Sequence, residues 1–347
     1  MREIRSIEIR GEAQVGAARR AVHDHASRLG FSETELAEID IVVQEIGTNA
    51  AVYATAGGWL HYTHTLGTQP GLELVYWDMG PGIYDLDHAI RDGVSTSGSL
   101  GAGLGAIRRL MNDFDVYSTV RQTSRLSMSS ARRTTHGTTM LARKWVAYDN
   151  QQPDIELVKR TGVWCRPHPG EQQSGDAYFI LRRDERTLFA VVDGLGHGGG
   201  AKQAADVAID SLSDWMGEPL DQVLLSVHDA LRATRGAVMG AAIIDYENES
   251  FHFGGVGNVA VRVFGAPEPI NPISTNGTLG ARLGSLRVWS YPWAAGATLV
   301  MTSDGVSNSW EISSYPDLLN HSPQLLAAIL MRDYGRDADD ATVLVAR

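Results

Sequence analysis

Residues 188–200 read LFAVVDGLGHGGG, an apolar run that ends in a carboxylate and a glycine-rich turn. The apolar run predicts a buried β-strand, so we expect Asp193 at the edge of a sheet. Gly194 lets the backbone turn, so that its carbonyl oxygen can face the same point as the Asp193 carboxylate. Both groups are hard oxygen ligands for a cation, although an aspartate-glycine pair after an apolar run is also an ordinary turn signal.

Further carboxylates recur at the ends of apolar runs across the second half of the chain. Asp176 opens the run AYFIL, Asp304 follows the run ATLVM, and Asp339 and Asp340 precede ATVLV. Carboxylates that meet at one end of a β-sandwich repel one another unless divalent cations lie between them, and all-oxygen sites suit Mg²⁺ or Mn²⁺ rather than zinc. Two such ions can bind a phosphate and activate a bridging water. The predicted metal ligands are Asp176, Asp193, Gly194, Asp304 and Asp339.

The order of the motifs SGD, DGLGHG, SDG and DDAT resembles that of the metal-dependent type-2C protein phosphatases, in particular their SpoIIE and RsbX-like branch. The resemblance spans about residues 155–347. It implies an αββα sandwich with two Mn²⁺ or Mg²⁺ ions that hydrolyses phosphoserine or phosphothreonine, with Asp193 and Asp304 in catalytic roles. Type-2C enzymes often carry a phosphate-binding arginine shortly before the first metal aspartate. Here EQQ at 171–173 stands in that place, so binding of the substrate phosphate would rest on the metal ions, with Arg166 as a secondary candidate.

The first half of the chain contains a helix with a polar pair. Ser32 and Glu35 form a capping signature, and the spacing that follows predicts a helix over about 36–56. Glu45 and Asn49 lie four residues apart on that helix and therefore share a face. An amide oxygen there can bind Mg²⁺ while the carboxylate takes a proton from an attacking hydroxyl, although a solvated helix face has the same spacing.

Two glycine-rich turns follow that helix. After a predicted hairpin over 59–77, Asp78 begins the turn DMGPG, where its carboxylate can accept the amino proton of an adenine ring. Residues 97–106, SGSLGAGLGA, precede a predicted helix, and the backbone amides of such a loop form a phosphate cradle with the positive end of the helix. The same glycines fit a dinucleotide fingerprint, but that fingerprint directly follows a strand, and DGVSTSGSL is not a strand pattern.

The motifs EIGTN, DMGPG, GAGLG and GTT, in this order, resemble the N, G1 and G2 boxes and the closing Gly-Thr of the GHKL ATP-binding fold. Within that fold they are most similar to the RsbT-like serine/threonine switch kinases of bacterial stress-signalling complexes, over about residues 5–145. The resemblance implies an α/β sandwich that binds ATP and Mg²⁺, with Glu45 as general base and Asn49 as Mg²⁺ ligand. The other implied nucleotide contacts are Asp78, Gly80, Gly82, Gly101, Gly103, Gly105 and Thr138.

The chain departs from the kinase pattern at 118–136, where a shorter turn is usual. The segment holds four arginines among serines and threonines. This composition indicates either a surface loop or a docking arm for an acidic partner.

Length and composition indicate a two-domain globular protein. The chain has 347 residues, of which 43% are hydrophobic and 20% charged. We assign 1–146 to the kinase-like domain, 147–154 to a linker and 155–347 to the phosphatase-like domain. The formal charge of −11 disfavours nucleic acid as a partner. The apolar runs are too short for a membrane span and the first residues lack a secretory core, so we expect a cytoplasmic protein without a membrane partner.

The two resemblances together predict a bifunctional regulator of a bacterial partner-switching pathway. Its kinase half would phosphorylate a STAS-domain protein, and its phosphatase half would remove the phosphate. Two alternatives stay open. In one, the nucleotide-binding half is only a sensor that controls the phosphatase. In the other, the protein is an anti-sigma-like binding switch without catalysis, which the presence of both sets of catalytic residues disfavours.

Overall fold

The computed structural model describes residues 2–54, 56–91, 103–120, 136–148 and 153–347. By their internal contacts these residues form two compact units. The C-terminal unit comprises Arg160–Trp310 and Leu326–Arg347. The N-terminal unit comprises Arg2–Lys159 together with Glu311–Leu325, which we call the returning segment.

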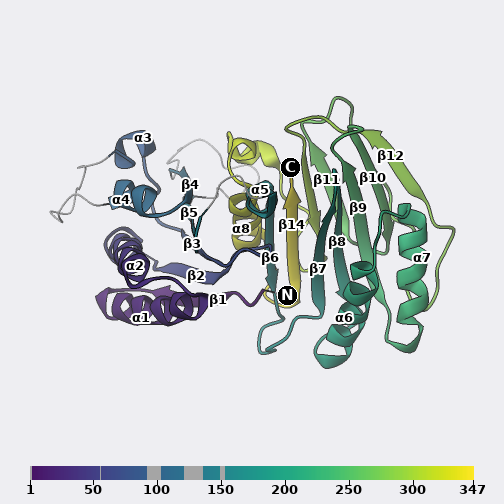
Figure 1. Ribbon diagram of the computed structural model, residues 1–347, viewed down its shortest axis with the longest axis horizontal. Helices are drawn as coiled ribbons and strands as arrows, with labels where there is room; N and C mark the ends of the chain where they lie inside the picture. The colour runs from purple at the N-terminus through teal and green to yellow at the C-terminus, as the bar shows by residue number, and fades with distance from the viewer. Residues whose placement is uncertain (1, 55, 92–102, 121–135, 149–152) are drawn as a thin grey trace, which may run out of the picture. The chain divides into compact units, whose positions relative to one another are not determined.

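The N-terminal unit is built on a five-stranded antiparallel sheet in the order β1-β2-β3-β5-β4, with helices α1 and α2 packed on one face (Figure 1). The strands are β1 (Arg5–Ile9), β2 (Gly58–His64), β3 (Gly71–Asp78), β4 (Asp113–Thr119) and β5 (Gly137–Trp145). The helices are α1 (Glu12–Leu29), α2 (Glu33–Tyr53), α3 (Leu86–Ala89), α4 (Gly103–Leu110) and α5 (Pro153–Arg160). Part of the predicted linker and most of the insertion at 118–136 lie outside the described residues.

Helix α2 is fixed at its start by a capping box. The backbone N–H of Ser32 donates to the Glu35 carboxylate at 2.8 Å, and the Ser32 hydroxyl accepts from the Glu35 N–H, as predicted. A glycine brings α2 close to α1, because a Cβ added to Gly47 would lie 2.6 Å from Val15 Cγ1. Since successive helical residues are 100° apart, Glu45 and Asn49 lie on the side of α2 away from Gly47.

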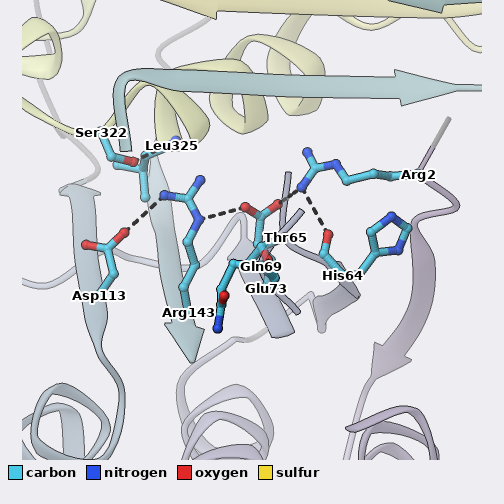
Figure 2. Close-up of polar contacts among 9 residues, drawn as sticks. All are labelled: Arg2, His64, Thr65, Gln69, Glu73, Asp113, Arg143, Ser322 and Leu325. Carbon is cyan, nitrogen blue, oxygen red and sulfur yellow. Dashed lines mark hydrogen bonds and ion pairs between the residues drawn. The ribbon is translucent and has the colours of Figure 1, made fainter. Parts of the chain in front are cut away.

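The other face of the sheet carries a buried row of charges (Figure 2). Strand register places Arg143 opposite Glu73 on one side and opposite Asp113 on the other. Arg143 Nε donates to Glu73 Oε2 at 2.8 Å, and its Nη1 donates to Asp113 Oδ2 at 3.0 Å. Arg2 Nη1 donates to Glu73 Oε1 at 3.0 Å. Figure 2 shows Ser322 of the returning segment beside Arg143, so this segment helps to cover the charged face.

The returning segment is held on β4 by one aspartate. Asp115 Oδ1 lies 2.8 Å from His321 Nδ1, and its Oδ2 accepts the Ser322 N–H at 2.6 Å. The His321 ring also meets Tyr117 edge-on, with centroids 5.2 Å apart. Burial alone would raise the pKa of Asp115, but the hydrogen bonds from His321 and Ser322 outweigh it and hold the pKa below its ordinary value.

We expect this contact to make the N-terminal unit less stable in acid. Because the folded pKa of Asp115 is depressed, its stabilisation is present above the ordinary aspartate pKa and is lost as pH falls through the lower folded pKa. Asp115→Asn should therefore cost about 2 kcal/mol at neutral pH, and the cost should shrink toward pH 3. Urea unfolding across pH measures the difference, with Asp24→Asn on the exposed face of α1 as the control. An equal loss of stability in Asp115→Asn at neutral pH and in acid would contradict this role of Asp115.

The C-terminal unit is a sandwich of two antiparallel sheets. The first has the order β12-β10-β9-β8-β7, and the second has the order β11-β13-β14-β6. The first sheet contains β7 (Asp176–Arg183), β8 (Arg186–Gly194), β9 (Ala237–Asp245), β10 (Ser250–Val256) and β12 (Val288–Pro292). The second contains β6 (Thr161–Arg166), β11 (Ala260–Phe264), β13 (Thr298–Thr302) and β14 (Ala341–Ala346). The helices are α6 (Gly199–Ser213), α7 (Leu220–Ala230) and α8 (Pro323–Tyr334).

Strand β8 divides its side chains between two buried faces. Leu188, Ala190 and Val192 belong to the core that packs under α6 and α7, which cover the outer face of the first sheet (Figure 1). Asp193 has the opposite parity, shared with the fully buried Val191. The period of two therefore turns Asp193 toward the interior between the sheets, at the end of the strand.

The predicted fold class is confirmed, because the chain is a mixed α/β protein with several sheets. The segment between β8 and β9 forms two α-helices, α6 and α7. The sequence Gly217-Glu218-Pro219 separates them, since Gly217 has a φ of 111° and Pro219 is the N-cap of α7. Among the described residues, no helix combines the length and apolarity needed to cross a membrane.

Candidate functional site

The N-terminal unit contains a cavity of about 330 Å³. Its walls come from α2, the end of β3 and the turn after it, α3, the start of α4, and β5. A cavity of this size is within the range of small-ligand sites. Six of the predicted residues line it, namely Glu45, Asn49, Asp78, Gly82, Gly103 and Thr138.

Asp78 is a buried acceptor at the end of β3, with 8% of its surface exposed. Its Oδ1 accepts the backbone N–H groups of Gly80 at 2.7 Å and Thr138 at 3.2 Å, and its Oδ2 accepts the hydroxyl of Tyr76 at 2.9 Å. Burial, and then the charge of Asp78, raise the pKa of Tyr76 well above its ordinary value, so Tyr76 keeps its proton and remains a donor. These three donors fix the orientation of the carboxylate.

Two glycines let the backbone close around Asp78. Gly82 has a φ of 79°, and a Cβ there would lie 2.2 Å from the carbonyl oxygen of Thr119. Gly137 has a φ of 121°, and a Cβ there would lie 2.1 Å from the carbonyl oxygen of Asp78. Both positions therefore require glycine for conformation and for space.

The remaining predicted nucleotide contacts have different placements. Gly80 supports Asp78 and does not line the cavity, and Gly105 is buried within α4. Gly101 lies outside the described residues. Tyr76 also lines the cavity, although it was not among the residues predicted from the sequence. Its position two residues before Asp78 on the same strand, and hence on the same face, was the available signal.

The predicted metal ligands of the C-terminal unit gather at one end of its strands. Asp176 begins β7 and is the cross-strand partner of Asp193 near the end of β8. Gly194 ends β8, Asp304 follows β13, and Asp339 precedes β14. The Gly194 carbonyl belongs to a tight turn, because a Cβ on Gly194 would lie 2.2 Å from the Ala201 carbonyl oxygen.

Neighbouring polar groups hold these carboxylates. Ser303 Oγ donates to Asp176 Oδ2 at 2.6 Å, and Asn258 Nδ2 donates to Asp304 Oδ2 at 2.8 Å. Asp340 is buried, with 4% of its surface exposed, and its Oδ1 accepts the His168 N–H at 2.8 Å. Ser303 and Asn258 were not among the site residues predicted from the sequence. Ser303 stands directly before Asp304, whereas nothing in the sequence connects Asn258 with Asp304.

The electrostatics of this end suit a cation. Burial, followed by the charges of Asp340 and Asp304, raises the pKa of Asp176 to about 7. Burial, followed by the charge of Asp176 and then those of the other aspartates, raises the pKa of Asp193 to about 8. Burial and then Asp304 also raise the pKa of Asp339. Divalent cations would relieve this repulsion, and the ligand atoms are the hard oxygens that Mg²⁺ and Mn²⁺ prefer.

The carboxylates are near one another without forming a closed cage. Over the described ranges, no three histidine, cysteine, aspartate or glutamate side chains already converge on a common ion position. The donor set therefore fits a divalent centre by its chemistry and mutual repulsion, and the final coordination would form when the ions bind.

Comparison with known proteins decides the family. The model of the histidine kinase-like ATPase domain matches residues 10–130. The serine/threonine-protein kinase RsbT of Bacillus subtilis (strain 168) is 36% identical over 113 residues, which cover 32% of this chain and 84% of RsbT. The chain belongs to the RsbT family. Its RsbT-like part contains the cavity described above.

The rest of the RsbT-family chain is similar to a phosphatase. The phosphoserine phosphatase RsbX of Bacillus subtilis (strain 168) is 24% identical over 164 residues, which cover 47% of this chain and 78% of RsbX. A solved chain from work on the bacterial stressosome, a modular system adapted to control secondary messenger signalling, is 31% identical with a TM-score of 0.52. The match covers 54% of this chain and 98% of the solved chain. The predicted fusion of an RsbT-like domain with an RsbX-like domain is confirmed.

Proposed function

We propose that this protein both adds and removes a phosphoryl group on a serine or threonine of a STAS-domain partner. The observation that carries the proposal is the arrangement of the cavity, where Glu45 and Asn49 of α2 line the same space as the fixed acceptor Asp78. Support for the opposing activity comes from the carboxylates at the end of the sandwich and from the similarity to RsbX.

In the kinase half, Asp78 would hold the adenine amino group, because its two oxygens are already oriented by backbone and tyrosine donors. Asn49 would bind Mg²⁺, and Glu45 would orient the incoming hydroxyl and take its proton. The nucleotide would lie against Gly82, Gly103 and Thr138, which line the cavity. Bound Mg·ATP would supply the phosphoryl group to be transferred.

In the phosphatase half, Asp176, Asp193, Asp304 and Asp339, with the carbonyl of Gly194, would hold two Mn²⁺ or Mg²⁺ ions. Bound divalent ions lower the pKa of water and neutralise phosphate charge. Ser303 and Asn258 keep two of these carboxylates in place through the hydrogen bonds described above.

We expect Asn49→Ala to abolish phosphoryl transfer by the full chain, and Glu45→Ala to remove transfer while leaving nucleotide binding largely intact. The reason is that Asn49 would hold the metal that bridges the phosphates, whereas Glu45 would act only on the incoming hydroxyl. Transfer of ³²P from ATP to a STAS-domain protein from the same genome measures activity in Asp193→Ala protein, which cannot remove the label. Calorimetry with Mg·ATP measures binding.

The control is Gln44→Ala, an exposed residue next to Glu45 on α2. Normal binding and normal transfer in Asn49→Ala would reject the kinase site. Nucleotide binding without transfer to any STAS protein would favour a sensor half that controls the phosphatase.

A further inference from the structure

An exposed arginine, Arg235, lies against the glycine turn that follows the predicted metal ligands. Strand register pairs Gly194 at the end of β8 with Ala237 at the start of β9. The Leu195 N–H also donates to the Gly236 carbonyl at 3.1 Å. Arg235 is therefore tied through its neighbours to the turn that begins at Asp193.

The side chain of Arg235 runs along this turn. A Cβ added to Gly200 would lie 2.5 Å from Arg235 Nε and 2.6 Å from its Cζ. A Cβ added to Gly196 would lie 3.3 Å from Arg235 Nη1. The guanidinium thus occupies space that only glycine leaves open, between the metal-ligand end of the turn and the first residues of α6.

Three other cations of the C-terminal unit are already paired. Lys202 on α6 bonds Asp206 at 2.6 Å, and Arg232 bonds Asp229 at 2.9 Å. Arg166, the candidate from the sequence, donates to Asp337 at 3.3 Å and to the Arg336 carbonyl. In the part of the chain that the structure describes, Arg235 has no hydrogen-bond acceptor or ion-pair partner.

We propose that Arg235 binds the phosphoryl group of the phosphatase substrate. The inference rests on the proposed phosphatase function and supplies a residue that it lacked. A phosphomonoester is a dianion, and a carboxylate-lined centre repels it wherever bound cations do not face it. The planar guanidinium can donate two parallel hydrogen bonds to phosphate oxygens, and its packing on Gly196 and Gly200 limits the entropy lost on binding.

Arg235 would contact the substrate directly during the hydrolysis. A water oxygen bonds to phosphorus, the bond between phosphorus and the serine oxygen breaks, and a proton passes to that oxygen. The products are inorganic phosphate and the free hydroxyl. Because Arg235 would contact only the non-bridging oxygens, it would hold substrate and product phosphate alike.

The test uses the full-length protein with Mn²⁺, p-nitrophenyl phosphate as substrate and inorganic phosphate as competing product. Arg235→Ala should raise KM and the inhibition constant for phosphate by about 10- to 100-fold, with a smaller change in kcat. Arg235→Lys should recover part of the loss, because it keeps the charge but loses the fork of donors. Mn²⁺ affinity by calorimetry should stay unchanged, as should all constants in the control Arg232→Ala.

A second variant reaches the same guanidinium from the other side. Gly200→Ala should displace the guanidinium of Arg235 and reproduce the rise in KM, while alanine at this helical position does not weaken α6. In an Arg235→Ala background, Gly200→Ala should then have no further effect. Additive losses would overturn the proposal, because they would place the two residues in separate roles.

Direct phosphate binding separates the inference from the function on which it rests. Turnover by wild type with unchanged KM and phosphate inhibition in Arg235→Ala would overturn the role of Arg235 and keep the phosphatase. Phosphate binding to the Mn²⁺-loaded wild type that weakens in Arg235→Ala, without turnover, would support the site and reject the phosphatase. A wild-type protein that neither binds phosphate nor hydrolyses the substrate would reject both the role of Arg235 and the phosphatase function.

Discussion

Replacing Asp193 with alanine is expected to abolish metal-dependent phosphatase activity while leaving the fold intact. Asp193 lies at the end of β8 opposite Asp176, and its carboxylate would hold the ions that activate water. Loss of a direct metal ligand should lower the activity by more than the roughly 10- to 100-fold that follows loss of a residue that only holds a ligand in place. The metal-free variant should be no less stable than wild type, because it removes one of several mutually repelling buried carboxylates.

Hydrolysis of p-nitrophenyl phosphate across a Mn²⁺ titration measures this loss, and the Mn²⁺-dependent rise in melting temperature provides a second readout. Both should vanish in Asp193→Ala. The matched control is Asp210→Ala, an exposed aspartate on α6. Full activity of wild type in a chelator, or an undiminished response of Asp193→Ala to Mn²⁺, would refute the assignment of these carboxylates to a metal centre.

Glu73→Gln is expected to give the largest loss of stability in the N-terminal unit. Burial would raise the pKa of Glu73, but the charges of Arg2 and Arg143 outweigh it and keep the pKa below its ordinary value. Glutamine preserves the volume of the side chain and removes its charge, which leaves two buried guanidinium groups without their shared partner. Breaking a buried ion pair in this way costs about 3–5 kcal/mol.

Hydrogen exchange of the β3 and β5 amides measures the loss where it arises. Glu3→Gln makes the same change in charge, but it affects an exposed pair with Arg5 and should cost under about 1 kcal/mol. Glu73→Gln should accelerate the exchange of these amides more than Glu3→Gln does. Equal exchange rates in the two variants would contradict the role of Glu73 as the shared partner of the two buried arginines.

The sequence predicted those features that depend on local periodicity and turn chemistry. Asp193 and Asp78 follow apolar runs and precede glycine turns, so their places at strand ends could be predicted from a few residues. The capping box at Ser32 and the shared face of Glu45 and Asn49 were accessible for the same reason.

Other features depend on strand register or on chain segments far apart, which periodicity does not encode. Glu73 and Arg143 meet across 70 positions of sequence, and Asp115 meets His321 across 206. Arg235 stands in a short turn with no motif of its own, and it gains significance only because β9 pairs with β8. Such residues could not have been selected from composition or spacing.

The returning segment has a consequence for the order of events during synthesis. The strands β1–β5 leave the ribosome early, yet His321, which bonds Asp115, follows it by 206 positions. Until His321 and Ser322 have been synthesised, β4 therefore lacks this cover. A nascent chain should show the N-terminal unit as a protease-sensitive intermediate until these two residues have left the ribosome.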